Sequence, residues 1–429
     1  QNKLIMKRFT IKGPNNAVRG EVSISGAKNS CLPLMAASVL FKNKVTLQNV
    51  PFVKDVYTMR DLLVSLGAKV EFSIEKKMMT ITNKKKHSLV VSYDKVSTMR
   101  AGVLLMGSLL ARYPMKKIKV ALGGGCALGV RDTNWHLAGF KSLGANNRLD
   151  QGYVNISSEK GLKGGKYKFP KVTVTGSSNL IMASVFNKGT HYIKNISIEP
   201  EVLDLINFLN NSGADIKFIG KRSIKINGVK QLISGKHTII GDRIEAFSYL
   251  CVGAITKKKV KIKNINPNFL KSETTVLKRI GYGIDIKYNS IDISPGNKLR
   301  PIKIKTGPFP NFATDNMPMI MAVLTIVQGK SQIDETIFSN RFMAAPELNR
   351  MGANITVKKN KAIIIGQKKL NAADCISSDL RTTFSIILGA IAAKGVSTIS
   401  RVYHGLRGYY NLESKLRKIG VRITSKDKW

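Results

Sequence analysis

The sequence predicts an α/β protein of two inside-out domains, each built from three repeated units with buried helices and outer sheets. The chain of 429 residues is too long for one ordinary hydrophobic core, so two domains are expected. A helix–glycine–strand junction recurs six times, and an apolar stretch of helical length accompanies each junction. Size, repeat and apolar helices together support this fold class.

The recurring junction consists of an amphipathic stretch, an apolar residue, a glycine and an alternating stretch that is typical of a strand. In the first copy, Val56, Met59 and Leu66 lie on one face of the helix that precedes the glycine. Glycine directly after a helix adopts the left-handed conformation that closes the last turn. The six glycines recur about every 70 residues, as copies of one ancestral unit would: Gly67, Gly144, Gly213, Gly281, Gly352 and Gly420.

The second helix of each unit is apolar nearly all round and is therefore expected to be buried. Each unit would bury this helix, expose part of the amphipathic one, and cover both with short antiparallel strands. Three units in each domain then place the helices inside and the sheets outside. The six apolar stretches are 28–40, 99–111, 177–186, 242–255, 314–327 and 378–393.

Polar and charged residues cluster at the starts of these apolar helices. Some are suited to capping the helix N-terminus: Ser178, Asp242, Thr314 and Ser378. Capping does not explain Lys28, Arg100 or Arg381, because a cation at a helix N-terminus opposes the helix dipole. If the helix starts converge between the domains, these cations predict an anion-binding site there.

The composition predicts a cytoplasmic protein without a membrane span. Apolar runs such as 384–393 are too short to cross a bilayer, and 1–13 has no apolar signal core. The four cysteines are far apart and form no C-x-x-C pair, so neither a metal site nor a disulfide scaffold is expected: Cys31, Cys126, Cys251 and Cys375.

The net charge of +44 leaves two interpretations open. It is typical of nucleic-acid-binding proteins, but the lysine runs at 83–87, 256–263 and 357–361 are scattered along the chain. They also fall where solvated turns between strands belong. A bias of composition is therefore favoured over a polyanion surface, and nucleic-acid binding stays an alternative.

Eight segments resemble one known family. They are GEVSISGAKNS (20–30), GGGCALGVR (123–131), IEPEVLDL (198–205), GDRIEA (241–246), ATDNM (313–317), SNRFMAAPELNRMGA (339–353), SSDLR (377–381) and RVYHGLRGYYNLESKLRKIG (401–420). Together and in this order they look like the UDP-N-acetylglucosamine 1-carboxyvinyltransferases of the enolpyruvyl transferase family. The resemblance covers nearly the whole chain. It implies one domain over 28–240 and a second that joins 1–27 to 241–429.

The resemblance also implies an activity. The enolpyruvyl group of phosphoenolpyruvate would move to the 3′-hydroxyl of UDP-N-acetylglucosamine with release of phosphate, by addition and elimination through a tetrahedral phospho-ketal. This reaction opens bacterial peptidoglycan synthesis, and hence serves cell-wall biogenesis, cell shape and division. It needs no metal and no organic cofactor. The expected partners are the two small-molecule substrates, with neither nucleic acid nor membrane, and the protein is expected to be a monomer.

The family motifs assign residues to the donor, whose phosphate and carboxylate must be neutralised by cations. Asp315 corresponds to the base for the sugar hydroxyl, and Asp379 to a second carboxylate near the transferring proton. The implied catalytic residues are Cys126, Asp315, Lys28, Asp379 and Arg407. The implied phosphoenolpyruvate-binding residues are Lys28, Asn29 and Arg131 with Arg341, Arg381 and Arg407; Lys28, Arg131 and Arg407 would hold the phosphate, and Arg341 and Arg381 the carboxylate.

Cys126 differs from the other three cysteines, which are expected to be small buried apolar residues. Glycines on both sides suit a lid that closes over bound substrate, and nearby positive charge favours the thiolate. By resemblance, Cys126 delivers the proton to the enolpyruvyl methylene carbon or forms a transient adduct with the donor.

The nucleotide-sugar side departs from the family pattern after the loop arginine, where RDTNW replaces the usual R-P-V-D at 131–135. An amide at Asn134 can still bond to a uracil edge or to backbone groups. His136 either orders this loop or has a structural role. The implied UDP-N-acetylglucosamine-binding residues are Arg100, Arg131, Asp132, Thr133, Asn134, Trp135, Val172, Thr173, Val174, Thr175, Asp315 and Ile337.

Three alternatives remain at this point. The sister enzymes of the family transfer enolpyruvate to shikimate 3-phosphate, but they lack a cysteine in a G-G-C loop. A basic nucleic-acid-binding protein on a similar repeat fold would explain the charge. A catalytically impaired paralogue would explain RDTNW, although the set of Lys28, Cys126, Asp315 and Arg407 is intact.

Overall fold

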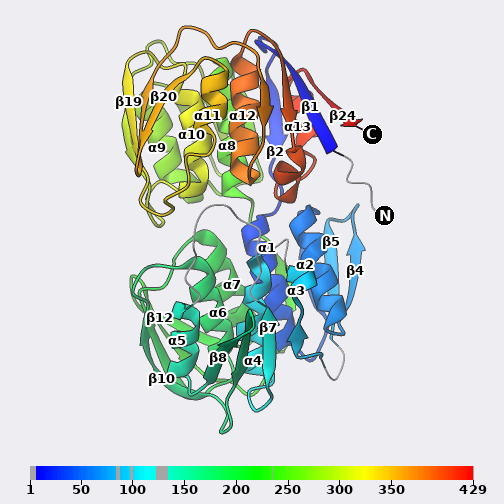
Figure 1. The fold of residues 1–429 in the computed structure, drawn as a ribbon. Helices are drawn as coiled ribbons and strands as arrows, with labels where there is room; N and C mark the ends of the chain where they lie inside the picture. The colour runs from blue at the N-terminus through cyan, green and yellow to red at the C-terminus, as the bar shows by residue number, and fades with distance from the viewer. Residues whose placement is uncertain (1–5, 84–86, 97–99, 122–133, 234, 429) are drawn as a thin grey trace. The chain divides into compact units, whose positions relative to one another are not determined.

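The chain folds into two compact lobes in the computed structural model, which describes residues 6–83, 87–96, 100–121, 134–233 and 235–428 (Figure 1). The N-terminal lobe contains the described residues between 26 and 240. The C-terminal lobe contains 6–25 together with 241–428. Each lobe consists of three repeats, and each repeat contributes one four-stranded sheet.

The N-terminal lobe has the strand orders β14-β3-β5-β4, β6-β7-β9-β8 and β10-β11-β13-β12. Its first repeat comprises α1 (Lys28–Ala37), η1 (Ser38–Leu40), β3 (Val45–Gln48), α2 (Lys54–Ser65), β4 (Lys69–Ser73) and β5 (Met78–Thr82). The second comprises β6 (Val90–Val91), α3 (Tyr93–Val96), η2 (Arg100–Leu104), α4 (Leu105–Arg112), β7 (Ile118–Ala121), α5 (Asn134–Ser142), β8 (Asn146–Asp150) and β9 (Tyr153–Ser157). The third comprises β10 (Lys163–Lys168), α6 (Val174–Ser184), β11 (Lys188–Lys194), α7 (Pro200–Asn211), β12 (Asp215–Gly220) and β13 (Ser223–Asn227), and β14 (Gly235–Thr238) then returns to the first sheet.

The C-terminal lobe has the strand orders β16-β17-β15-β2, β18-β19-β21-β20 and β22-β23-β1-β24. Its first repeat comprises β2 (Gly20–Ser23), α8 (Arg243–Thr256), β15 (Val260–Lys263), η3 (Pro267–Leu270), α9 (Lys271–Ile280), β16 (Gly283–Lys287) and β17 (Ser290–Ser294). The second comprises β18 (Lys303–Lys305), η4 (Thr314–Asn316), α10 (Met317–Leu324), β19 (Lys330–Asp334), α11 (Ala345–Arg350), β20 (Asn354–Lys358) and β21 (Lys361–Ile365). The third comprises β22 (Asp374–Ile376), α12 (Leu380–Ala392), β23 (Gly395–Ser400), η5 (Val402–Arg407), α13 (Leu412–Lys418), β24 (Ile423–Lys428) and β1 (Met6–Gly13).

The sheets differ from the expected antiparallel arrangement, because each contains one parallel pair. In four of the sheets, the apolar helix itself connects the two parallel strands, as α6 connects β10 to β11. Parallel neighbours need a crossover of this length, whereas antiparallel neighbours can be joined by a tight turn. The prediction of purely antiparallel strands was therefore wrong, and the buried helix is the reason.

The predicted repeat is confirmed at all six junctions. Each of the six glycines follows an amphipathic helix and has a positive φ, between +82° and +118°. At Gly281, φ is +118°, and a Cβ atom would lie 2.5 Å from the carbonyl oxygen of Lys298. Both the backbone conformation and the close approach require glycine there.

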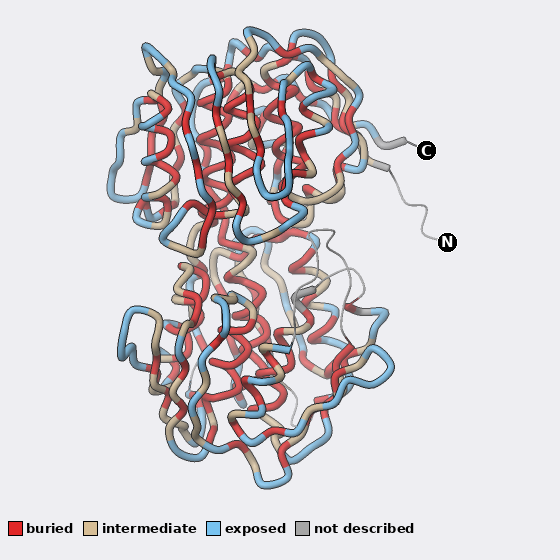
Figure 2. The backbone as a smooth tube through the Cα atoms, turned by 60° about the vertical axis from the view of Figure 1, so that its left-hand side comes forward, coloured by how far each residue is buried: buried red, intermediate tan, exposed pale blue. Residues whose placement is uncertain are grey.

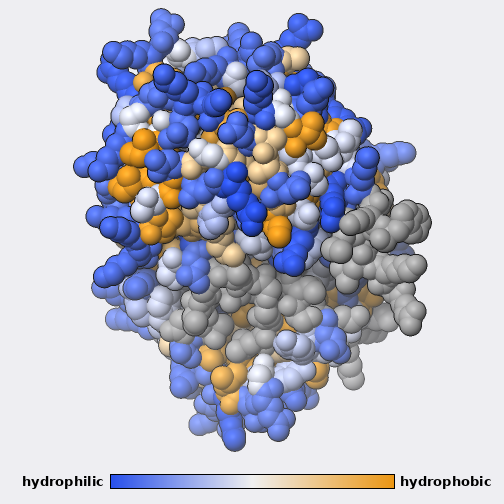
Figure 3. All heavy atoms as spheres, turned by 45° about the horizontal axis from the view of Figure 1, so that its top comes forward, coloured by the Kyte–Doolittle hydropathy of each residue, from blue (hydrophilic) through white to orange (hydrophobic). Residues whose placement is uncertain are grey.

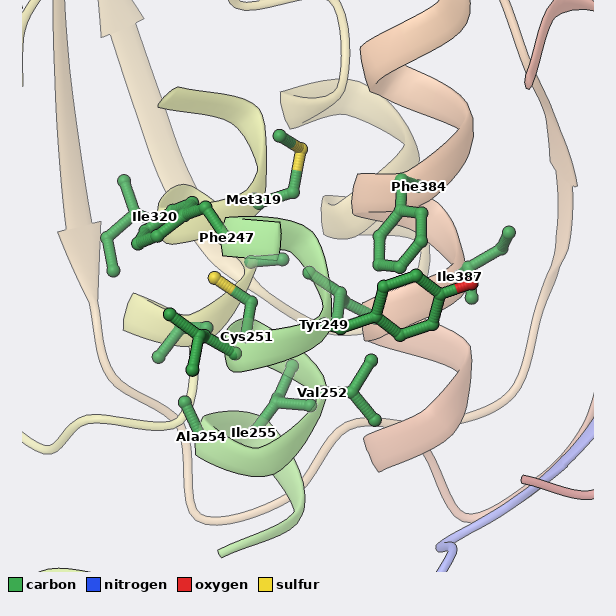
Figure 4. Packing of buried hydrophobic residues seen from close by; sticks show 14 of the residues in the cluster. Phe247, Tyr249, Cys251, Val252, Ala254, Ile255, Met319, Ile320, Phe384 and Ile387 are labelled. Carbon is green, nitrogen blue, oxygen red and sulfur yellow. The ribbon is translucent and has the colours of Figure 1, made fainter. Parts of the chain in front are cut away.

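The apolar helices form the cores, so the inside-out prediction is also confirmed. Figure 2 shows buried backbone in the interior of each lobe and exposed backbone on its outer strands and turns. In the C-terminal lobe, Tyr249 of α8 packs against Phe384 of α12 with 5.5 Å between ring centroids, and Ile387 lies beside it (Figure 4). Phe247 on the same helix contacts Phe312, with 5.6 Å between ring centroids.

The capping predictions were right at one helix and wrong at three. Asp242 caps α8 by accepting hydrogen bonds from the backbone N–H groups of Ile244 and Glu245, at 2.8 and 3.0 Å. Thr173 caps α6, which begins before Ser178, and Asp379 rather than Ser378 caps α12. Thr314 does not cap η4, because its hydroxyl donates to Glu335 at 3.0 Å.

Among the described residues, no helix is both long and apolar enough to cross a bilayer. The face drawn in Figure 3 is mainly hydrophilic, and its hydrophobic residues form scattered patches.

A buried histidine predicts a pH dependence of stability. His191 on β11 is fully buried, and its ring nitrogens lie 2.8 Å from the hydroxyl of Ser184 and 3.1 Å from that of Ser142. Burial lowers the pKa of His191 from 6.5 to about 4. Between these values the unfolded chain binds more protons than the folded one, so the histidine reduces stability as the pH falls from 6.5 towards 4, by at most about 3 kcal/mol.

Urea unfolding of wild type and His191→Gln at several pH values would measure this effect. As the pH falls, the free energy of unfolding of wild type should decrease relative to that of His191→Gln. A difference that is constant from pH 7 to pH 4 would contradict the assignment.

Candidate active site

In the C-terminal lobe, two buried arginines converge on Asp315. Asp315 lies in η4, immediately before the apolar helix α10. One carboxylate oxygen accepts a hydrogen bond from Arg341 at 2.6 Å, and the other accepts two from Arg381, at 2.9 and 3.2 Å. The arginine side chains are 2% and 4% exposed, whereas that of Asp315 is 29% exposed. The cluster therefore presents its carboxylate towards solvent and keeps the guanidinium groups inside.

Arg381 is held at the start of α12 by the local fold. Asp379 caps this helix, accepting from the backbone N–H groups of Arg381 and Thr382 at 2.8 and 3.0 Å. The guanidinium lies over the ring of Tyr409, 5.5 Å from its centroid, and the Tyr409 hydroxyl lies 2.9 Å from that of Ser248. Burial alone would lower the pKa of Arg381, but Asp315 and Tyr409 raise it above its usual value, so the side chain keeps its charge.

Arg341 is fixed from a different direction, in the turn before α11. Its Nε donates to the carbonyl oxygen of Thr314 at 3.0 Å, and its guanidinium lies 5.9 Å from the ring centroid of Phe338. The backbone of η4 and the side chain of Asp315 thus hold the same arginine. This arrangement orients a planar cation whose fork suits a carboxylate or a phosphate.

Two buried carboxylates that the sequence analysis missed support η4. Glu335 accepts from the Thr314 hydroxyl through one oxygen, and from the backbone N–H groups of Ile337 and Phe338 through the other, at 2.7 and 3.1 Å. Glu273 accepts from the backbone N–H of Ala313 and from the amide of Asn316, at 3.0 and 3.1 Å. Burial raises the pKa of Glu273, while Arg243 and these hydrogen bonds oppose that shift.

Ile337, Asp379 and Arg407 lie on three different segments of the same lobe. Ile337 is 39% exposed in the bend that Glu335 organises. Asp379 faces its own helix as a cap. Arg407 ends η5, which packs on α12 closely enough that a Cβ atom at Gly405 would lie 2.7 Å from the Cγ2 atom of Thr383.

In the N-terminal lobe, Lys28 begins α1 and forms a salt bridge of 3.0 Å with Asp55 of α2. Both side chains are largely buried, at 11% and 6% exposed. A bound anion was predicted from the cation at this helix start; in the structure, the carboxylate of Asp55 compensates the charge. Asn29 follows Lys28 and is half-buried.

Beyond Asn29, α1 continues a polar network. The Ser30 hydroxyl donates to Asp204 of α7, and Asp204 also accepts from His237 at 2.8 Å. These contacts fix the start of α1 against the rest of the lobe.

Of the described residues assigned to the nucleotide sugar, Asp315 and Ile337 lie in the C-terminal lobe, and the others lie on three segments of the N-terminal lobe. Arg100 begins η2, and Asn134 is the exposed first residue of α5. Trp135 is half-buried, and its carbonyl oxygen accepts from the Tyr167 hydroxyl at 2.9 Å. His136 is buried and lies 3.0 Å from the amide nitrogen of Asn179, which supports its structural role.

The segment of Val172 to Thr175 forms the start of α6. Thr173 caps the helix by accepting from the backbone N–H of Gly176 at 3.3 Å. Val174 is exposed, whereas Val172 and Thr175 are half-buried. Cys126, Arg131, Asp132 and Thr133 lie outside the described residues.

The three described cysteines are free and buried, as expected: Cys31, Cys251 and Cys375. Burial raises the pKa of Cys375 to about 12 and shifts those of Cys31 and Cys251 upwards, so these thiols are unreactive. Within the described ranges, no three His, Cys, Asp or Glu side chains are grouped as metal ligands.

Comparison with known proteins gives a consistent picture. The family model described as EPSP synthase (3-phosphoshikimate 1-carboxyvinyltransferase) matches residues 12–416. The UDP-N-acetylglucosamine 1-carboxyvinyltransferase of Pelagibacter ubique (strain HTCC1062) is 44% identical over 418 residues, 97% of this chain and 99% of that protein. The protein of the same name from Campylobacter jejuni (strain RM1221) is 43% identical over 421 residues, 98% of this chain and 99% of that protein.

Solved structures agree at the level of the fold. The enolpyruvyl transferase NikO from Streptomyces tendae has a TM-score of 0.89 at 21% identity, over 99% of this chain and 100% of that chain. An EPSP synthase from Acinetobacter baumannii has a TM-score of 0.78 at 18% identity, over 98% and 100% of the two chains.

The paired arginines predict a stability difference between two substitutions of Asp315. Asp315→Ala removes the carboxylate that both buried guanidinium groups contact, and should lower the free energy of unfolding by about 3 kcal/mol. Asp315→Asn keeps an oxygen acceptor and should cost less. Urea unfolding of the two variants and wild type measures this, and equal stability of all three would show that the cluster adds nothing to folding.

Proposed function

The chain belongs to the EPSP synthase family of carboxyvinyltransferases, and from this premise we propose that it transfers the 1-carboxyvinyl group of phosphoenolpyruvate to the 3′-hydroxyl of UDP-N-acetylglucosamine. The observation that carries the proposal is the identity of 42–44% over nearly the full chain to relatives named for this reaction. The likeness to EPSP synthase structures, at 17–18% identity, supports the fold and not the acceptor. Release of phosphate and entry of the product into peptidoglycan synthesis follow from the same proposal.

The reaction requires cations that neutralise the donor, and proton transfer at two atoms, the acceptor oxygen and the methylene carbon of the donor. The acceptor oxygen attacks C2 of phosphoenolpyruvate while the methylene carbon gains a proton, which gives a tetrahedral phospho-ketal. Loss of a proton from the new methyl group then restores the double bond as the C2–O bond to phosphate breaks. We assign the sugar hydroxyl's proton to Asp315, because its carboxylate is the solvent-accessible member of the arginine cluster.

The arginine contacts suggest how Asp315 becomes free to act as a base. A carboxylate that accepts three hydrogen bonds from arginines is a poor proton acceptor, because these bonds stabilise its charged form. The donor carboxylate offers the same planar fork to Arg341 and Arg381. We propose that it replaces Asp315 as their partner, so that donor binding releases the base.

Lys28 and Asn29, with Arg131 and Arg407, remain our assignment for the donor phosphate. Asp55 forms a salt bridge of 3.0 Å with Lys28, and a phosphate would compete for the same ammonium group. Asp379 remains assigned to the transferring proton, although both its oxygens already accept hydrogen bonds at the start of α12. For the nucleotide sugar we retain the segments around Arg100, 131–135, 172–175, Asp315 and Ile337.

We also propose a cytoplasmic monomer. The free thiols of Cys31, Cys251 and Cys375 suit a reducing compartment.

A phosphate-release assay tests the proposed reaction. Phosphate should appear from phosphoenolpyruvate when UDP-N-acetylglucosamine is present and not when shikimate 3-phosphate replaces it. Asp315→Asn should reduce kcat by at least about 100-fold, since it removes the base. Donor binding should stay intact, because the charged side chain that competes with the donor carboxylate for both arginines is gone. Release that depends on shikimate 3-phosphate alone would overturn the assignment of the acceptor.

Covalent labelling tests the role assigned to Cys126. An epoxide phosphonate such as fosfomycin carries an anionic group for the cationic site and an electrophilic carbon for a thiolate. Mass spectrometry should find one adduct, on Cys126, formed faster when UDP-N-acetylglucosamine is bound. The buried thiols of Cys31, Cys251 and Cys375 serve as internal controls, and an adduct on any of them instead would count against the assignment.

A further inference from the structure

The outer sheet β10-β11-β13-β12 of the N-terminal lobe has a cationic face. Its inward side chains, including Ile193, Ile224 and Ile226, are fully buried. On the other face, lysines lie opposite lysines on neighbouring strands. The pairs in register are Lys163 with Lys188, Lys168 with Lys194, and Lys217 with Lys225. We call this surface, with Lys166, the lysine face.

Like charges directly opposite each other destabilise a sheet, so three such pairs are a cost to folding. The four strands, all of whose residues are described, carry a single carboxylate, Asp215, which pairs with Lys217 at 3.0 Å. In another sheet a lysine pairs with carboxylates instead. Lys261 lies in register with Glu21 on one neighbouring strand and with Asp292 on the other. Two other sheets have one pair of cations each, Arg8 with Lys426 and Lys358 with Lys361, and a third pairs two carboxylates, Asp285 with Asp292. The lysine face therefore concentrates positive charge beyond the general bias of the chain.

One apolar side chain is exposed at one end of the lysine face. Ile219 is 50% exposed and lies where the strand pairing is irregular, between Phe218 and Gly220; Phe218 pairs with the inward Ile224 and belongs to the opposite face. The turn that follows contains Lys221 and Arg222. Lys168, Lys194 and Ser223 form one row across the sheet. Ser223 pairs with Gly220, so this row lies at the same end of the sheet. The exposed side chain of Ile219 thus lies at the end of the sheet that carries four cations: Lys168, Lys194, Lys221 and Arg222.

The middle of the face holds an aromatic residue. Tyr192 is half-buried and lies between Lys166 and Lys225 in one row across the sheet. Tyrosine has an apolar ring and a polar hydroxyl, a combination that is enriched where protein meets the surface of a bilayer.

We propose that the lysine face docks on an anionic phospholipid surface. Four strands spaced ~4.8 Å apart spread the lysines over ~14 Å perpendicular to the strands. Cations spread in two dimensions match a plane of lipid headgroups better than they match one polynucleotide strand. Ile219 enters the boundary between headgroups and acyl chains, while the lysines contact lipid phosphates. A single-stranded nucleic acid would need aromatic platforms for its bases, and Tyr192 is the one aromatic side chain on the outward rows of the four strands.

Co-sedimentation with vesicles tests this proposal. The full chain should bind phosphatidylcholine vesicles that contain phosphatidylglycerol, bind pure phosphatidylcholine much less, and lose binding as salt rises. The double variant Lys168→Gln/Lys194→Gln should bind about 25-fold less tightly, since each lysine near an anionic bilayer contributes about fivefold in affinity. Its stability should not fall, because the substitution removes a like-charge pair.

The matched control is Lys303→Gln/Lys330→Gln, which makes the same change of charge on exposed residues of β18 and β19. It should leave vesicle binding within twofold of wild type. Ile219→Ser should weaken binding without changing its dependence on salt. Equal losses in the two double variants would show that total charge alone matters and would overturn the proposal. So would equal binding to both kinds of vesicle, or a larger effect of Lys168→Gln/Lys194→Gln on binding of a single-stranded RNA than on vesicles.

Discussion

Both lobes depend on satisfying the backbone N–H groups at the starts of helices that are buried on all sides. Water reaches these groups poorly, and at α6, α8 and α12 polar side chains accept from them instead. Asp242, Asp379 and Thr173 supply caps from their own repeats, whereas Glu273 reaches Ala313 from the preceding helix of the C-terminal lobe. Polar and charged residues therefore gather at the starts of these helices. A fold that buries its helices in this way creates a concentrated set of charges before any substrate binds.

The cluster around Asp315 uses that set of charges. Arg341 and Arg381 are almost fully buried, and an uncompensated buried cation would be costly. Asp315 stabilises both, and Tyr409 covers one face of Arg381. The arginines are thus held in place by an internal anion, in an orientation that suits an external one. Lys28 and Asp55 repeat this arrangement in the N-terminal lobe with a single pair.

The sequence was sufficient for the architecture because its signals are local and periodic. The six glycines and six apolar helices follow from spacing alone, and Asp315 and Arg381 were recognised within family motifs. Two caps were assigned to the wrong residue because the first turn of a helix was misplaced by one to several residues, at Ser378 and Ser178. Glu335, Glu273, Tyr409 and Asp55 were missed, since each contacts a residue of the site that is 21 or more residues away in sequence.

The position of β1 delays completion of the C-terminal lobe during synthesis. This strand pairs with both β23 and β24, so the first described strand completes a sheet with the last described one. At ~5–20 residues per second, the ribosome needs roughly 20–80 s to make the intervening chain. The repeats between 26 and 240 are translated in that interval and can fold first. Until β23 and β24 have been synthesised, β1 has no native neighbours in its sheet, and its unpaired edges are exposed to chaperones and to other nascent chains.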